Sequence, residues 1–175
     1  MSGHGPGASG AAASTEPYRP VFTGAASAEL DAILTRYPTK MAALLPALWI
    51  VQRERGWVSA EGMVEVAERL ELTPAYVKGV VSFYTMYHAH PVGKHFIQVC
   101  TTSPCGACGA EKVVEAMLKH SGCGELGATS PDGRFTVIEV ECLGACGFAT
   151  PVMVDDDFIE SVTPDKVPQL LGKYR

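Results

Sequence analysis

The chain has 175 residues, of which 47% are hydrophobic, and a formal net charge of -5. This length allows one ordinary domain, or a small helical unit joined to a small α/β unit. No apolar run reaches the roughly 20 residues that a membrane-spanning helix needs, and the negative charge argues against nucleic acid, whose phosphates are bound mainly by Lys and Arg. We therefore expect a soluble protein with no direct membrane span and no nucleic-acid partner.

The N-terminal segment, residues 1–25, is rich in Gly, Ala and Ser and has little hydrophobic periodicity. This composition predicts a disordered tail. The segment holds a single Arg, which is a poor match to the Arg-rich transit peptides of organelles, and it has no signal-peptide pattern. We therefore expect a bacterial cytoplasmic protein, whose six cysteines lie in a reducing compartment.

Residues 26–90 have apolar side chains at the spacing of four helices, which predicts a small helical bundle. The predicted helix starts carry capping residues, and the second helix contains a proline that is expected to kink it. The four starts are Ser27, Lys40 (with Pro46 inside the helix), Ser59 and Thr73-Pro74.

The last two of these helices, residues 59–84, can also be drawn as a helix-turn-helix, a motif of many DNA-binding proteins. Its second helix, residues 75–84, carries one Lys and no Arg. Contacts to phosphates and bases would then be scarce, so DNA binding is the weaker interpretation.

The hydrophobic period changes in residues 91–175 from that of helices to a mixture of strands and helices. The predicted order is strand, helix, strand, hairpin and helix, which is typical of a thioredoxin-like sheet. We expect Pro168 to shorten or kink the last helix. The predicted segments are 95–99, 110–120, 135–140, the hairpin of 151–154 and 158–162, and a helix from Thr163-Pro164 to about Tyr174.

Two pairs of cysteines follow the two predicted strands. Cys100 and Cys105 have the spacing C-x4-C, and Cys142 and Cys146 have the spacing C-x3-C. Four thiolates can bind zinc or an iron-sulfur cluster, and zinc sites usually use tighter C-x2-C pairs. We therefore favour a [2Fe-2S] cluster as the cofactor. Both loops are rich in small and hydroxyl residues, which can bring hydrogen-bond donors to its sulfurs and stabilise the more negative reduced form.

The remaining cysteines leave alternatives open. Cys108 completes a C-x4-C-x2-C pattern with Cys100 and Cys105, the opening of a plant-type ferredoxin signature, but that set would leave the second pair without a reason to be a pair. Cys105 and Cys108 also form a C-x-x-C, which a thiol-disulfide oxidoreductase would use. Cys123 has no spaced partner and is expected to be a small buried hydrophobe.

Other catalytic signatures are missing from the sequence. It contains no convincing nucleophile-base pair, no phosphate-binding loop and no dinucleotide fingerprint. The chain is thus expected to carry an electron without having a complete active site of its own.

A series of motifs resembles the thioredoxin-like [2Fe-2S] subunit of the peripheral arm of respiratory complex I, the NADH-quinone oxidoreductase. The resemblance extends from about Ser27 to the C-terminus. Its motifs are Ser82-Phe83-Tyr84-Thr85-Met86-Tyr87, Pro91-Val92-Gly93, residues 99–105, residues 129–136 and residues 140–147.

The resemblance implies an α+β protein, with an N-terminal helical bundle followed by a thioredoxin-like α/β [2Fe-2S] ferredoxin domain. It implies a cluster held by four thiolates, those of Cys100, Cys105, Cys142 and Cys146. It further implies that the chain docks against the subunit that binds NADH and FMN, beside other peripheral-arm subunits, at the cytoplasmic face of the inner membrane. Its cluster would exchange an electron with FMN. Related subunits serve NAD-linked hydrogenases and formate dehydrogenases.

Two segments depart from the family pattern. Gly147-Phe148-Ala149-Thr150-Pro151-Val152 stands where the family usually has Gly-Asn-Ala-Pro-Met-Val, so the proline comes one position later. Gly106-Ala107-Cys108-Gly109 replaces bulkier residues and adds a thiol. Neither change removes an expected ligand, but the first is expected to alter the strand entry beside the cluster.

Overall fold

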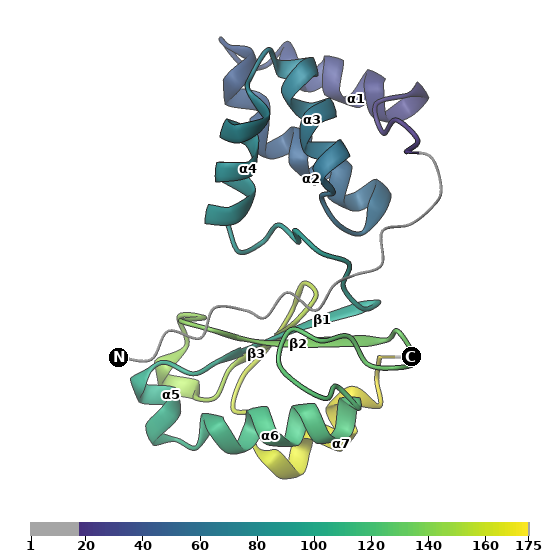
Figure 1. Cartoon of the computed structure of the whole chain (residues 1–175). Helices are drawn as coiled ribbons and strands as arrows, with labels where there is room; N and C mark the ends of the chain where they lie inside the picture. The colour runs from purple at the N-terminus through teal and green to yellow at the C-terminus, as the bar shows by residue number, and fades with distance from the viewer. Residues whose placement is uncertain (1–17, 175) are drawn as a thin grey trace. The chain divides into compact units, whose positions relative to one another are not determined.

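The computed structural model describes residues 18–174, so residues 1–17 of the predicted tail lie outside the described part. The described chain divides into two compact units, residues 18–91 and residues 92–174 (Figure 1). Each unit has its own hydrophobic core. In the described part, no helix is long and apolar enough to span a bilayer.

The first unit consists of helices that pack around one apolar core. Leu30, Leu48 and Val77 are fully buried there. The caps expected at Ser59 and Thr73 are present, with each hydroxyl accepting a hydrogen bond from an amide three residues later. The elements are α1 (Gly24–Leu34), η1 (Lys40–Ala43), α2 (Leu44–Arg55), α3 (Ala60–Leu70) and α4 (Pro74–Phe83).

The last residues of the segment expected to be a tail contribute to the first unit. Val21 and Phe22 are buried, and their amides donate to the two carboxylate oxygens of Glu65 at 2.8 and 2.7 Å. This anchoring lets α1 begin at Gly24, so Ser27 lies inside the helix and does not cap it.

The kink expected at Pro46 is absent from α2. A 3-10 turn, η1, precedes this helix, and α2 begins at Leu44. Pro46 therefore lies in the first turn, where its missing N–H would have had no partner within the helix.

The second unit is a four-stranded mixed sheet in the order β2-β1-β3-β4. Strand β1 pairs with β2 in parallel and with β3 in an antiparallel manner. Helix α6 packs against β1, β2 and α7, and Figure 1 places α6 and α7 on one side of the sheet. The elements are β1 (His95–Cys100), α5 (Ser103–Ala107), α6 (Ala110–Ser121), β2 (Phe135–Val140), η2 (Cys146–Phe148), β3 (Val152–Val154), β4 (Asp157–Ile159), η3 (Pro164–Lys166) and α7 (Val167–Leu171).

Helices and a mixed sheet together confirm the prediction of an α+β fold. The expected strand 135–140 is β2 without any change of bounds, and the expected helix 110–120 is one residue longer as α6. Helix α5 was not expected, because its five residues are too few for a hydrophobic period. The last helix is short, as expected, with a 3-10 turn before it and Pro168 in its first turn.

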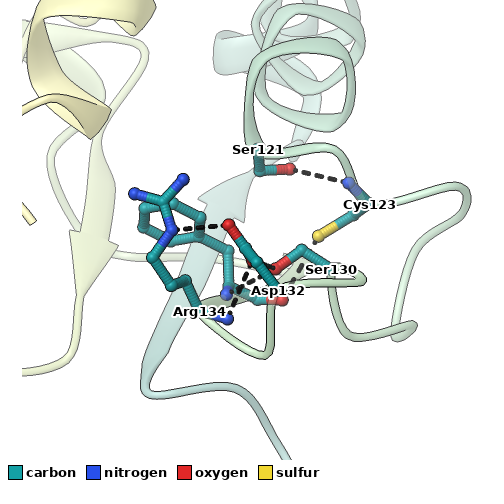
Figure 2. Close-up of polar contacts among 6 residues, drawn as sticks. Ser121, Cys123, Ser130, Asp132 and Arg134 are labelled. Atoms are coloured by element: carbon teal, nitrogen blue, oxygen red, sulfur yellow. Dashed lines mark hydrogen bonds and ion pairs between the residues drawn. The ribbon is translucent and has the colours of Figure 1, made fainter. Parts of the chain in front are cut away.

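The turn into β2 is held by side chains that Figure 2 shows together. The hydroxyl of Ser130 donates to Asp132 at 2.6 Å, and Nε of Arg134 donates to the same carboxylate at 2.6 Å. The nearby Cys123 is buried, and its thiol donates to the carbonyl of Phe135 at 3.3 Å. Cys123 therefore belongs to the core, as expected.

The start of β1 lies unusually close to the start of β2. A Cβ atom added at Gly93 would lie 2.7 Å from the carbonyl carbon of Phe135 and 2.8 Å from its amide nitrogen. The amide of Gly93 donates to the hydroxyl of Thr136 at 2.8 Å. Only glycine permits this approach, because the neighbouring atoms are backbone and cannot rotate away.

We predict that Gly93→Ala lowers the free energy of unfolding by about 1–3 kcal/mol, the usual range for a clash in a packed region. Urea unfolding followed by circular dichroism measures the change. Gly79→Ala is the matched control. Gly79 lies inside α4, and among the described residues no atom other than those of its chain neighbours and of the adjacent helix backbone comes within 4 Å of a Cβ atom added there. This control should be neutral or stabilising because alanine favours helix, and an equal loss in both variants would contradict the close-approach argument.

The hydrogen bonds from Ser130 and then Arg134 lower the pKa of Asp132 to about 2. A lowered pKa means that the carboxylate stabilises the fold above its ordinary pKa of about 4 and loses this effect as the pH falls through about 2. Asp132→Asn should therefore be less stable than the wild type at neutral pH, and the difference should shrink in acid. Unfolding measured from pH 7 downward tests this, and a difference that stays constant with pH would contradict it.

Candidate metal centre

The parallel pairing of β1 with β2 places their C-terminal ends side by side. In this register, Cys100 stands opposite Val140, the last residue of β2. The amide of Thr101 donates to the carbonyl of Val140 at 3.2 Å, so the pairing continues to the point where both strands end. Cys142 follows two residues later. Both cysteine-bearing loops therefore leave the same edge of the sheet.

The first loop brings its two cysteines together in the interior. Cys100 and Cys105 are 2% and 1% exposed, and their sulfur atoms are 3.4 Å apart. Helix α5 produces this contact, because it turns the chain back after β1 and carries Cys105. Ala110 completes the buried group, and the partly buried Leu143 packs against it from the second loop.

Backbone groups of both loops surround the sulfur of Cys100. Burial acts to raise the pKa of Cys100, but hydrogen bonds from the backbone amides of Leu143 and Thr102 outweigh it and hold the pKa below its ordinary value. The carbonyl oxygen of Glu141 lies 3.7 Å from the same sulfur. The second loop thus reaches the first one at Cys100.

The pKa of Cys105 shifts in the opposite direction, upward. Burial raises its pKa to about 11, helped by the neighbouring Cys100 and by the charges of Cys146 and Cys108. These charges act on Cys105 only because both residues lie near it. Within the interior pair, the thiolate form is therefore favoured more strongly at Cys100 than at Cys105.

The other cysteines of the two loops lie at the surface. Cys108, Cys142 and Cys146 are exposed. The amide of Gly144 donates to the sulfur of Cys142 at 3.3 Å, and Gly144 has a φ of 77°, which favours glycine. Within residues 18–174, no three His, Cys, Asp or Glu side chains are grouped as they would be around a metal ion.

The chemistry of this edge fits a thiolate-bound cluster. Amides of Leu143, Thr102 and Gly144 donate to cysteine sulfurs, and such donors stabilise anionic sulfur. Of the two cysteine pairs, the buried Cys100 and Cys105 come from one loop, and the exposed Cys142 and Cys146 come from the other. A bound cluster would therefore be held from inside by the first loop and covered by the second.

Sequence reasoning found some of these donors and missed others. Thr102 and Gly144 are of the small and hydroxyl types from which donors are expected, whereas the amide of Leu143 carries no side-chain signal. Thr150 lies beside the displaced proline. It is 1% exposed, and its hydroxyl has no hydrogen-bond partner among the described residues.

The acidic turn after β3 has a structural role. The carboxylate of Asp155 accepts from the amide of Phe96 at 2.8 Å and lies 2.7 Å from Nδ1 of His95. These contacts fasten the hairpin to the start of β1, at the end of that strand away from Cys100.

Comparison with known proteins places this chain in a described family. The family model "Thioredoxin-like [2Fe-2S] ferredoxin" matches residues 30–175. The chain is 38% identical over 157 residues to "NADH dehydrogenase [ubiquinone] flavoprotein 2, mitochondrial" of Dictyostelium discoideum, covering 88% of this chain and 63% of that protein. It is 39% identical over 149 residues to "NADH-quinone oxidoreductase subunit 2" of Thermus thermophilus, covering 83% and 82%.

Among solved structures, an NAD+-reducing [NiFe]-hydrogenase in the air-oxidized state resembles the chain with a TM-score of 0.64 at 18% identity. That match covers 75% of this chain and 22% of the hydrogenase chain, and it supports the fold alone. The chain spans less than two thirds of the length of the Dictyostelium protein and of several other relatives. The family match over residues 30–175 and the relatives at 38–39% identity agree with the thiolate chemistry of the sheet edge. This chain belongs to the thioredoxin-like [2Fe-2S] ferredoxin family, and its cofactor is a [2Fe-2S] cluster.

Proposed function

We propose that this chain is an electron-transfer subunit of an NADH:quinone oxidoreductase, with its [2Fe-2S] cluster held by Cys100, Cys105, Cys142 and Cys146. The observation that carries the proposal is the meeting of the two cysteine loops at one sheet edge, where the amide of Leu143 reaches the sulfur of Cys100. Residues 91–175 would form the cluster-binding domain, and residues 26–90 a helical bundle.

The cluster, when bound, takes up and releases one electron at a time. The residues of the chain set the conditions for this chemistry. Burial of Cys100 and Cys105 keeps water from one side of the site. Backbone amides aimed at the sulfurs of Cys100 and Cys142 offset negative charge, which favours the reduced form.

The contact between the two loops supports the paired ligand set over C-x4-C-x2-C. Cys108 follows helix α5 and is exposed, as Cys142 and Cys146 are, so exposure does not separate the two sets. If Cys108 were a ligand, one thiol of the second loop would be unused, although that loop already contacts Cys100. The paired set gives both loops a role.

Thiol-disulfide exchange is the weaker function for Cys105 and Cys108. That chemistry needs a thiolate nucleophile with a lowered pKa at an accessible position. Cys105 is 1% exposed, and burial raises its pKa to about 11. An electron carrier has no such requirement.

The partner we propose is the subunit that binds NADH and FMN, in the peripheral arm of the complex at the cytoplasmic face of the inner membrane. The support is the names of the relatives, which are subunits of NADH dehydrogenases, together with the missing dinucleotide fingerprint in this sequence. The cluster would exchange its electron with FMN. The equivalent subunit of an NAD-linked hydrogenase or formate dehydrogenase is the alternative.

We predict that anaerobically purified protein contains roughly two irons and two sulfides per chain, the content of a [2Fe-2S] cluster. It should be EPR-silent when oxidised and should give one spin per two irons after dithionite. Alanine at Cys100, Cys105, Cys142 or Cys146 should abolish or strongly reduce the signal, because each variant removes one thiolate.

The matched control is Cys108→Ser, which changes an exposed cysteine outside the proposed set and should keep the iron content and the signal. Loss of the cluster in Cys108→Ser, with retention in either alanine variant of the second loop, would establish the C-x4-C-x2-C set instead. A colourless protein with one zinc would contradict the cluster altogether.

We predict that NADH reduces the cluster only when the NADH- and FMN-binding subunit is present, because the chain lacks a dinucleotide site of its own. The reduced EPR signal, recorded after NADH is added to the chain alone, to the chain with free FMN, and to the co-purified pair, measures this. Reduction of the chain alone by NADH, or no reduction in the pair, would contradict the proposed place in the complex.

A further inference from the structure

Thr150 has a buried hydroxyl without a partner beside the cysteine loops. The residue is 1% exposed, and its Oγ1 makes no hydrogen bond in the described part of the chain. It follows η2, which begins with Cys146, and precedes strand β3 by two positions. A hydroxyl removed from water with no partner destabilises a fold, so its retention requires a reason.

Both neighbours of Thr150 face the first cysteine loop. The carbonyl of Pro151 accepts a hydrogen bond from the amide of Cys100 at 3.3 Å. Ala149 packs against the buried group formed by Cys100 and Cys105. The carbonyl of Thr150 itself accepts from the amide of Val162 at 3.0 Å, which fixes its backbone. The chain on both sides of Thr150 therefore contacts the loop that carries the two interior cysteines.

Other buried hydroxyls of this unit have partners inside the protein. Thr136 is also 1% exposed, but its hydroxyl accepts from the amide of Gly93 and bonds to the hydroxyl of Thr129, both at 2.8 Å. The second buried side-chain atom without a partner in residues 18–174, Nε2 of His95, belongs to the residue that begins β1. Of these two atoms, only Oγ1 of Thr150 belongs to a segment whose neighbouring residues contact the Cys100 loop.

We propose that the hydroxyl of Thr150 donates a hydrogen bond to a bridging sulfide of the bound [2Fe-2S] cluster. This inference rests on the function proposed above. Sulfur becomes more negative when the cluster is reduced, so a donor stabilises the reduced form and raises the midpoint potential. Thr150 is thus a residue that sets the potential, while the four thiolates hold the iron.

The test compares Thr150→Val, Thr150→Ser and the control Thr136→Val in the full chain. Valine keeps the shape of threonine and removes the hydroxyl, and serine keeps the hydroxyl. Iron and sulfide content is measured first. An EPR redox titration then gives the midpoint potential, and resonance Raman spectra in H2O and D2O report hydrogen bonds to the cluster sulfurs.

Thr150→Val should keep its cluster, have a more negative midpoint and lose part of the deuterium-induced shift of the Fe–S bands. Thr150→Ser should remain near the wild type. Thr136→Val should unfold at lower urea concentration without moving the midpoint, because its hydroxyl is used within the fold. In metal-free protein, Thr150→Val should be at least as stable as the wild type, since no protein partner is lost.

An unchanged midpoint together with an unchanged deuterium shift in Thr150→Val would overturn the role of Thr150 and leave the cluster assignment intact. If Thr150→Val assembles no cluster, the smaller Thr150→Ala provides the same comparison. If Thr150→Ala also assembles none while Thr136→Val does, the residue acts in packing and the inference fails. Wild-type protein without iron and sulfide would overturn both this inference and the proposed function.

Discussion

The parallel pairing of β1 with β2 is the constraint on which the site depends. In this register Cys100 and Val140 lie opposite each other, so both strands end at one edge and each releases a cysteine loop there. A parallel pair requires a long crossover connection, which α5 and α6 supply. The start of this crossover also shapes the site, because α5 places the sulfur of Cys105 next to the sulfur of Cys100. Topology therefore brings together two cysteine loops that lie far apart in the sequence.

A site with several thiolates is destabilised by charge repulsion, because thiolates repel one another in a medium of low dielectric constant. In this chain the cysteines lie in two different environments. Cys100 is buried but receives backbone amides, whereas Cys105 is buried and stays protonated until a metal displaces its proton. Cys142 and Cys146 lie at the surface, outside this buried pair. The first loop therefore brings its two cysteines together in the interior, and the second loop contacts it through Leu143.

Much of this organisation could be read from the sequence, because it depends on periodicity and on spacing. Strand 135–140 is rich in β-branched residues and ends just before Cys142, and the caps at Ser59 and Thr73 carry their own side-chain signal. Helix α5 could not be read, since five residues contain no full hydrophobic period. The amide of Leu143 was equally hidden, because every residue except proline offers one. Burial of Val21 and Phe22 was missed because their partner, Glu65, is more than forty residues away.

The displaced proline shows how a departure from a family pattern can preserve one interaction and add another. Proline keeps its carbonyl, and that of Pro151 accepts from the amide of Cys100 beside the first loop. Its missing N–H is harmless at this position, because β3 begins only at Val152 and pairs there with Val99. Moving the proline to 151 leaves position 150 open to a side chain with a polar atom. The unpaired hydroxyl of a threonine at this position destabilises the metal-free fold, and an acceptor for its hydrogen bond would offset that loss. In the proposed arrangement, a sulfur of the bound cluster is this acceptor.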